Sequence, residues 1–231
     1  SLILSIPNLV AVDPEMEITI CQTNVMREGK TICECSRDLH GSFTEFVTIN
    51  KSKMIAQFSS HFAPGTRDSE ELIILGDSRG RITFITTDRT ESPPKMISKL
   101  STEQMIIRIG VSCRSTSRGG GLFDTLTALG SRGSVRVIWF GSWGFGGEFE
   151  FEIGFPIQSS NNVTCSDGII AIGTDEGLKL VDPFAQPESI GDGPTSREAK
   201  ITKIECQGRR ISSCCSVPSL KVGFPRVCAI D

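Results

Sequence analysis

The stretch Asp167-Gly168-Ile169-Ile170-Ala171-Ile172-Gly173-Thr174-Asp175-Glu176-Gly177-Leu178-Lys179-Leu180-Val181-Asp182 decides the fold. Two apolar runs of about five residues flank a loop of small and polar residues with glycine at both ends, a pattern typical of a tight β-hairpin. A helix is the poorer interpretation, because two glycines within about one turn would each cost roughly 1 kcal/mol relative to alanine, and no apolar stripe with a period of 3.6 runs through them. The stretch therefore predicts two antiparallel strands joined by a polar turn.

Similar hairpins are predicted at four other places in the chain. Their strand pairs are residues 17–21 and 30–34, 71–75 and 81–85, 125–129 and 134–139, and 211–217 and 226–231. In the first of them, Asn24 to Gly29 is predicted to be a polar turn. The second and third repeat the glycine-bounded loop, as Gly76-Asp77-Ser78-Arg79-Gly80 and Gly130-Ser131-Arg132-Gly133.

Further strands are expected around these hairpins. The candidates are Leu2 to Leu4, Leu9 to Val12, Phe43 to Ile49, Met54 to Phe58, Met105 to Val111, Glu148 to Ile153, Val163 to Cys165 and Lys200 to Cys206. The alternation of Phe149 and Phe151 with glutamates predicts a strand with one solvated face. Loops are predicted at Ser59 to Glu70, Arg114 to Gly121, Gly141 to Gly147 and Pro183 to Ser196.

The spacing of the hairpins predicts the architecture. When the ends of their second strands are aligned, the following residues fall in register, roughly 43 to 53 residues apart: Glu34, Thr86, Trp139, Asp182 and Asp231. This period lies in the range typical of propeller blades, in which four-stranded sheets pack face to face. We therefore predict an all-β chain, with residues 1–231 forming a single β-propeller domain of about five four-stranded blades. If the ring closes, Leu2 to Leu4 should complete the last blade.

Several of these residues resemble a known family. Leu178-Lys179-Leu180-Val181-Asp182 resembles the "Ile-Arg-Val-Trp-Asp" ending of a WD repeat with valine at the tryptophan position, and Val135-Arg136-Val137-Ile138-Trp139 resembles it with the tryptophan shifted. The loop that begins at Gly173 is also similar to the hairpin of citron-homology and vesicle-tethering propellers. No Gly-His dipeptide opens a blade and no complete Trp-Asp occurs, so the buried His-Asp network of that family is not expected. The resemblance implies a WD-repeat-like propeller, and because that family most often has seven blades, an incomplete part of a seven-bladed ring is an alternative.

Composition limits the partners. A net charge of -3 and a pI near 5.6 favour neither nucleic acid nor an anionic membrane. No apolar stretch approaches the 18 or so residues of a membrane helix, and no secretory signal precedes the first strand, so we expect a soluble cytoplasmic or nuclear protein without membrane insertion. Because the sequence begins with serine, we expect a fragment or a processed product. The nine cysteines are predicted to be reduced, and their spacing does not predict a metal site or a cofactor.

The candidate binding residues lie in the glycine-bounded turns. In a propeller these turns gather on one rim, and the residues predicted to contact a partner there are Asp77, Arg79, Arg132, Asp175 and Glu176. Mixed charge of this kind suits an electrostatically selective contact with a protein or peptide. The alternative interpretation is that turns are polar simply because they are solvated.

Two classes of function follow. The first is a non-catalytic interaction scaffold that binds partner proteins or peptides through its rim loops, either alone or as a subunit of a larger complex. The second is a five-bladed, glycosidase-like enzyme with two carboxylates in the central funnel, for which Asp77 and Asp175 are the candidates, since we expect them to occupy equivalent loops. His61, expected in a loop, has no identifiable catalytic partner. The scaffold is favoured because no nucleophile and base, and no acid and base, converge in the sequence.

Overall fold

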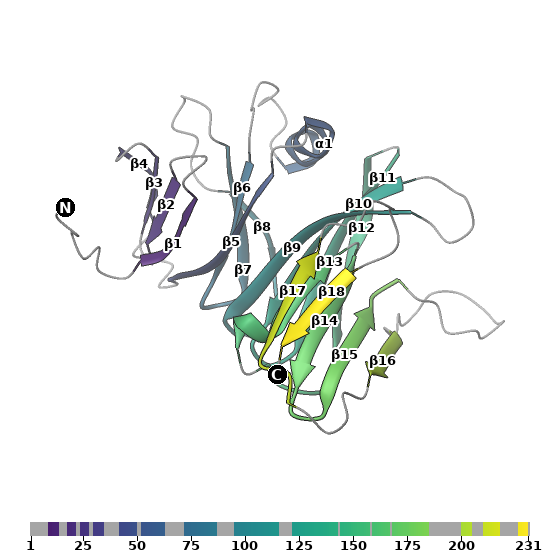
Figure 1. Ribbon diagram of the computed structural model, residues 1–231. Coiled ribbons are helices and arrows are strands. Elements are labelled where there is room, and N and C mark those ends of the chain that lie inside the picture. Colours follow the sequence, from purple (N-terminus) through teal and green to yellow (C-terminus); the bar gives the residue numbers. More distant parts are fainter. Residues whose placement is uncertain are drawn as a thin grey trace. The chain divides into compact units, whose positions relative to one another are not determined.

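The protein is all-β and its strands pair in the order of the chain (Figure 1). The computed structural model describes residues 9–13, 18–21, 24–27, 30–34, 42–49, 52–62, 72–86, 95–115, 122–142, 144–157, 159–166, 168–184, 200–204, 210–217 and 226–230. Within these residues the strands form four antiparallel sheets of four strands and one of two strands. The chain thus repeats one simple unit, in which each strand turns back beside the previous one.

We name the sheets A to E in chain order. Sheet A contains β1 Leu9–Asp13, β2 Ile18–Cys21, β3 Asn24–Arg27 and β4 Lys30–Glu34. Sheet B contains β5 Phe43–Ile49, β6 Leu72–Asp77, β7 Arg81–Thr86 and β8 Lys95–Lys99. Sheet C contains β9 Ile106–Ser115, β10 Leu122–Gly130, β11 Ser134–Gly141 and β12 Gly144–Glu152. Sheet D contains β13 Val163–Ser166, β14 Ile169–Thr174, β15 Gly177–Asp182 and β16 Lys200–Ile204, and sheet E contains β17 Ser213–Val217 and β18 Arg226–Ile230.

The chain divides into two compact units. The first unit holds sheets A and B and consists of Ser1–Lys99 and Glu103–Ile106. The second unit holds sheets C, D and E and consists of Leu100–Thr102 and Ile107–Asp231. The four-stranded repeat itself is confirmed. The single domain, the number of blades and the closure of a ring stay predictions.

The glycine-bounded hairpins are confirmed as the second and third strands of their sheets. In the stretch quoted first, Ala171 opposes Leu180 and Gly173 opposes Leu178 across β14 and β15. The pairs β6–β7 and β10–β11 are formed in the same way, and β17 pairs with β18 as predicted.

Sheet A differs from the prediction. Residues 24–27 are the strand β3, not a turn, so β2 and β4 do not pair with each other but lie on either side of β3. Only two residues separate β3 from each neighbouring strand, and its polar ends made it look like a loop. Glu34 therefore ends a fourth strand, whereas Thr86 and Asp182 end third strands, so Glu34 does not share their register.

A helix replaces the strand predicted at Met54 to Phe58. The helix α1, Ser52–Phe62, lies between β5 and β6 and includes the start of the segment predicted as a loop from Ser59. Met54, Ile55 and Phe58 are buried, and Phe62 contacts Phe58 and Phe84 with ring centroids 6.0 and 6.4 Å apart. Met54, Ile55, Phe58 and Phe62 are spaced as the residues of one helical face, and no proline or glycine interrupts the segment.

Smaller differences concern strand ends. The loop predicted at Gly141 to Gly147 is shorter than expected, because Gly144 already begins β12. The predicted loop from Arg114 begins later, since β9 continues to Ser115. Leu2 to Leu4 and most of the loops at 59–70, 114–121 and 183–196 lie outside the described residues.

Sheets C, D and E stack face to face within the second unit. Ile170 and Ile172 of β14 pack with Val135 and Val137 of β11 in one buried cluster, which joins sheet D to sheet C. The intervening Ala171 belongs to another cluster, with Leu178, Ile211 and Cys214, which joins sheet D to sheet E. Because alternate residues of a strand point to opposite faces, a strand buried on both faces must be apolar throughout, as β14 is.

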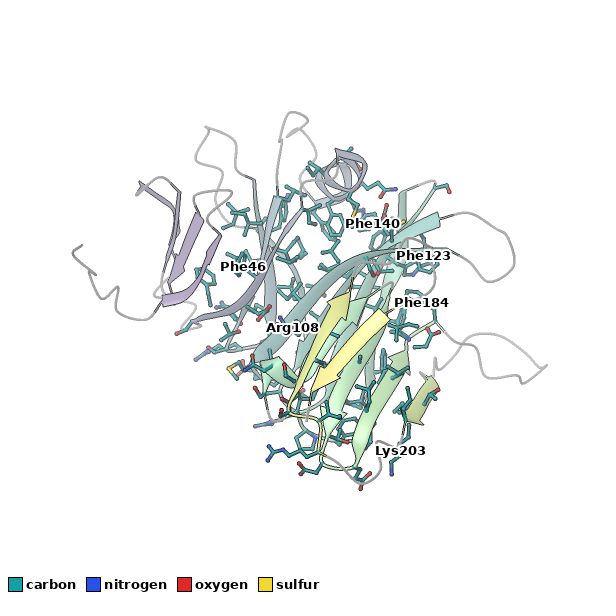
Figure 2. The ribbon with its side chains drawn as sticks, in the orientation of Figure 1. Phe46, Arg108, Phe123, Phe140, Phe184 and Lys203 are labelled. Carbon is teal, nitrogen blue, oxygen red and sulfur yellow. The ribbon has the colours of Figure 1, made fainter. Side chains whose placement is uncertain are left out.

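First strands also meet between neighbouring sheets. β1 contacts β5 in the first unit, and β13 lies beside β17 in the second (Figure 1). β9 approaches β13 so closely that a Cβ added to Gly110 would overlap Cys165, and Arg108 donates to the Val163 carbonyl oxygen at 3.1 Å (Figure 2). Within each unit, neighbouring sheets thus contact each other through their first strands.

Candidate functional site

The turn between β6 and β7 is shaped by the carboxylate of Asp77. Its side chain is only 6% exposed. Oδ1 accepts hydrogen bonds from the backbone N–H groups of Arg79 and Arg81, at 2.8 and 2.9 Å, and Oδ2 accepts from Arg81 Nε. Gly80 completes the turn with a φ of 78°, and its N–H donates to the Asp77 carbonyl oxygen at 3.3 Å. Asp77 thus holds the turn that presents Ser78 and Arg79, of which Ser78 is exposed and Arg79 half-buried.

The turn between β10 and β11 is held by backbone hydrogen bonds. Gly133 adopts a φ of 98° and donates to the Gly130 carbonyl oxygen at 3.0 Å. The segment that follows β12 lies against this turn, since Ile157 N–H donates to the Ser131 carbonyl oxygen at 3.0 Å. Arg132 is exposed on the outer side.

The turn between β14 and β15 carries two exposed acids. Thr174 Oγ1 accepts from the Glu176 N–H at 3.3 Å and donates to the Gly177 carbonyl oxygen at 2.9 Å, so Thr174 does here what Asp77 does in its turn. Asp175 and Glu176 have side chains 63% and 66% exposed. Asp77 and Asp175 thus lie in equivalent loops, each between the second and third strands of a sheet, but the structural counterpart of Asp77 within its loop is Thr174 and not Asp175.

Each of these acids pairs with a base from elsewhere in the second unit. Arg210 Nε lies 3.2 Å from Asp175 Oδ1, and Lys203 Nζ lies 3.4 Å from Glu176 Oε2. Lys203 comes from β16 and Arg210 immediately precedes β17. Each turn acid is thus joined to a basic side chain of a neighbouring strand or segment.

The two turns of the second unit lie at the same end of its sheets. Phe155 connects them, because its carbonyl oxygen is packed against Gly133 and its ring lies under Lys179 of β15, with Nζ 4.0 Å from the ring centroid. We call this end the charged rim, made up of the exposed or half-buried residues Arg132, Asp175, Glu176, Lys179, Lys203 and Arg210.

Aromatic side chains gather at the opposite end of the same strands. Phe184, two residues beyond β15, contacts Phe123 at 4.9 Å and Phe149 at 5.6 Å between ring centroids (Figure 2). Figure 2 also shows Lys203 at the other end of sheet D. The second unit thus has one charged end and one aromatic end.

No known protein family matches the sequence, and no curated protein matches it either. The candidate site therefore rests on the geometry of the turns. In each unit separately, the structure places the predicted residues as follows: Asp77 and Arg79 in one turn of the first unit, and Arg132, Asp175 and Glu176 at one end of the second.

The sequence analysis did not predict three members of the charged rim, namely Lys179, Lys203 and Arg210. Their positions follow from strand pairing, since Lys179 opposes Lys203 across β15 and β16 and Ile211 N–H donates to the Thr174 carbonyl oxygen at 3.1 Å. The alternation of Lys200-Ile201-Thr202-Lys203 was a usable signal for a strand with charged residues on it.

Other kinds of site place different requirements on the described residues. In the part of the chain that the structure describes, no three His, Cys, Asp or Glu side chains gather in a group that could hold a metal ion. His61 lies in α1 and not in a loop as expected, with its ring 4.7 Å from that of Phe62. Among the described helices none is long and apolar enough to cross a membrane. The cysteines at 113, 165, 214 and 215 are not in disulfide bonds.

Proposed function

We propose that this protein is a non-catalytic interaction scaffold of the WD-repeat-like propeller type, which binds a partner protein or peptide in the cytoplasm or nucleus through its turn loops. The charged rim is the principal contact surface in this proposal. The turn at Asp77 supplies a second one, in which Asp77 fixes the backbone and Arg79 meets the partner.

One observation carries the proposal. Asp175 and Glu176 are largely exposed, yet each is held beside a basic side chain on a turn whose backbone is fixed by Thr174. Exposed ion pairs contribute little to stability, typically below about 1 kcal/mol, so these charges are not needed to hold the fold. A rigid surface with both signs of charge selects partners by complementary charge and steers their approach.

The residues of the rim also suit a polar partner rather than an apolar one. Arg132, Asp175, Glu176 and Arg210 are all exposed, and the ring of Phe155 is partly covered by the amine of Lys179. A partner that inserts a carboxylate beside Lys203 or Arg210 would replace an existing ion pair with an equivalent one. Exchange of this kind costs little desolvation, which suits reversible binding.

The test is affinity capture of partners with the charge of the rim reversed. Immobilised wild-type chain is compared with an Asp175→Lys, Glu176→Lys variant, and captured proteins are identified by quantitative mass spectrometry. We expect at least one partner to be lost by about tenfold or more, since a lost rim interaction of about 1.4 kcal/mol has that effect on affinity. The retained fraction should also fall as ionic strength rises.

The matched control carries the same change of charge away from the turns. Glu103→Lys combined with Glu148→Lys also reverses two exposed acids. Both variants must keep the circular dichroism spectrum of the wild type. Identical sets of partners for the wild type and both variants would contradict the proposal, as would equal losses from the rim variant and the control.

A further inference from the structure

Two cysteines lie directly opposite each other in sheet E. Cys215 of β17 and Cys228 of β18 are partners in the antiparallel register, between the pairs Cys214 with Ala229 and Ser216 with Val227. Figure 1 shows these two strands side by side. Opposed positions of an antiparallel pair share one face of the sheet, so the register assigns Cys215 and Cys228 to the same face.

The backbone spacing of such a pair suits a disulfide. Opposed residues have Cα atoms about 4.5 to 5.5 Å apart and Cβ atoms at a similar separation. A disulfide requires Cα atoms about 4.4 to 6.8 Å apart and Cβ atoms about 3.5 to 4.5 Å apart. The Cα spacing typical of opposed residues therefore falls within the range that a disulfide requires.

Accessibility separates Cys215 from its neighbour. Cys214 is 6% exposed and packs with Ala171, Leu178 and Ile211 between sheets D and E. Cys215 is exposed and carries a thiol. Because adjacent residues of a strand point to opposite faces, the side chains of Cys214 and Cys215 diverge and cannot be bridged without movement of the backbone.

We propose that Cys215 and Cys228 form a redox-sensitive cross-strand pair, which closes to a disulfide when a low-molecular-weight disulfide such as oxidised glutathione is present. The first thiolate attacks one sulfur of the small disulfide, forms a mixed disulfide and releases one small thiol. The opposed thiolate then attacks the protein sulfur of the mixed disulfide and releases the second small thiol. Two protein thiols together lose two protons and two electrons, and the small disulfide gains them.

The disulfide covalently joins β17 to β18. Sheet E has two described strands, whereas each of the other sheets has four, and two-stranded sheets are the least stable alone. A bond between opposed residues also fixes the register, because a slip by one residue would separate the two sulfurs onto opposite faces. Oxidation therefore stabilises the pairing of this hairpin without changing its architecture.

The test is peptide mapping of the chain equilibrated with reduced and oxidised glutathione, then quenched with acid, alkylated and digested with trypsin. Cleavage after Arg210, Lys221 and Arg226 places Cys215 in peptide 211–221 and Cys228 in peptide 227–231. We expect these two peptides to be linked in the folded chain. Their linked fraction should fall on the order of tenfold in guanidinium chloride, where the register no longer brings the two thiols together.

Two matched variants identify the sulfur on β17. Cys215→Ala should abolish the link, whereas Cys214→Ala, the same change one residue away in the same peptide, should preserve it. Fragmentation of the wild-type linked peptides assigns the sulfur directly, so the result does not depend on how the variants fold. A bond within peptide 211–221, a link through Cys214, or an equal linked fraction in the folded and denatured chain would each overturn the proposal.

Discussion

Replacement of Ile172 by alanine tests the packing between sheets C and D most sharply. Ile172 is 1% exposed and lies in the buried cluster that contains Val135, Val137 and Val181. The change removes three buried carbons, worth about 2.5 kcal/mol at roughly 0.8 kcal/mol for each. The cavity that remains adds to this loss, so we expect the free energy of unfolding of the second unit to fall by about 3 to 4 kcal/mol.

The control is Ile201→Ala on β16, which removes the same atoms from a side chain that is 43% exposed. We expect a cost below about 1 kcal/mol, because a large part of that side chain is already exposed to water and its removal leaves no closed cavity. Both variants are measured by urea unfolding, followed by circular dichroism and by tryptophan fluorescence, with unchanged denaturant slopes. Equal costs for Ile172 and Ile201 would refute the stacking of sheet D on sheet C.

Two further predictions concern the turns. Asp77→Ala should lower the free energy of unfolding of the first unit by about 2 to 4 kcal/mol, because it leaves the Arg81 guanidinium, 12% exposed, without its carboxylate. The control Ser78→Ala should lower it by less than about 1 kcal/mol. Equal urea midpoints for the two variants would contradict the role of Asp77. Gly133→Ala should cost at least about 2 kcal/mol, since the residue has a φ of 98° and its Cβ would meet the Phe155 carbonyl oxygen. The control Gly144→Ala, at a residue with a φ of 113° but open space around it, should lower the free energy of unfolding by only about 1 kcal/mol, measured by thermal unfolding. A larger cost for Gly144→Ala than for Gly133→Ala would contradict the contact with Phe155.

The parts of the fold that the sequence predicted are those encoded locally. The turns at Gly76 to Gly80, Gly130 to Gly133 and Gly173 to Gly177 contain the residues that a tight turn requires, between apolar runs that can only be buried. These signals are complete within about 15 residues, so they identify the hairpins without any knowledge of the rest of the chain. The outer strands of sheets C and D and the strand β5 of sheet B were also predicted, whereas β8, Lys95–Lys99, was missed.

The missed elements are short and their signals are ambiguous. Met54 to Phe58 has a brief apolar run that suits a buried strand or a helix equally well, and only Phe62, one turn further, distinguishes the two. Asn24 to Arg27 is a strand of four residues with polar ends, and its pairing with β2 and β4, rather than its own composition, makes it a strand. Here tertiary context decides the structure.

The candidate site was predictable only in part. Asp175 and Glu176 stand out as acids in a turn, but their partners Lys203 and Arg210 are about 30 residues away in sequence, and only the pairing of β15 with β16 brings the first of them near. The sequence also did not show that Asp77 and Asp175 have different roles in their turns. Asp77 bonds to the backbone two and four residues on, whereas in the other loop Thr174 takes that place and leaves Asp175 exposed.

The measurement that tests the serial four-stranded arrangement most directly is the pattern of cross-strand backbone contacts, observed by nuclear Overhauser spectroscopy on the isotope-labelled chain. Leu180 of β15 should show contacts to Ala171 of β14 on one side and to Thr202 of β16 on the other. If Leu180 instead contacts only one of them, or a strand that does not neighbour β15 in chain order, the proposed arrangement of the sheets is wrong.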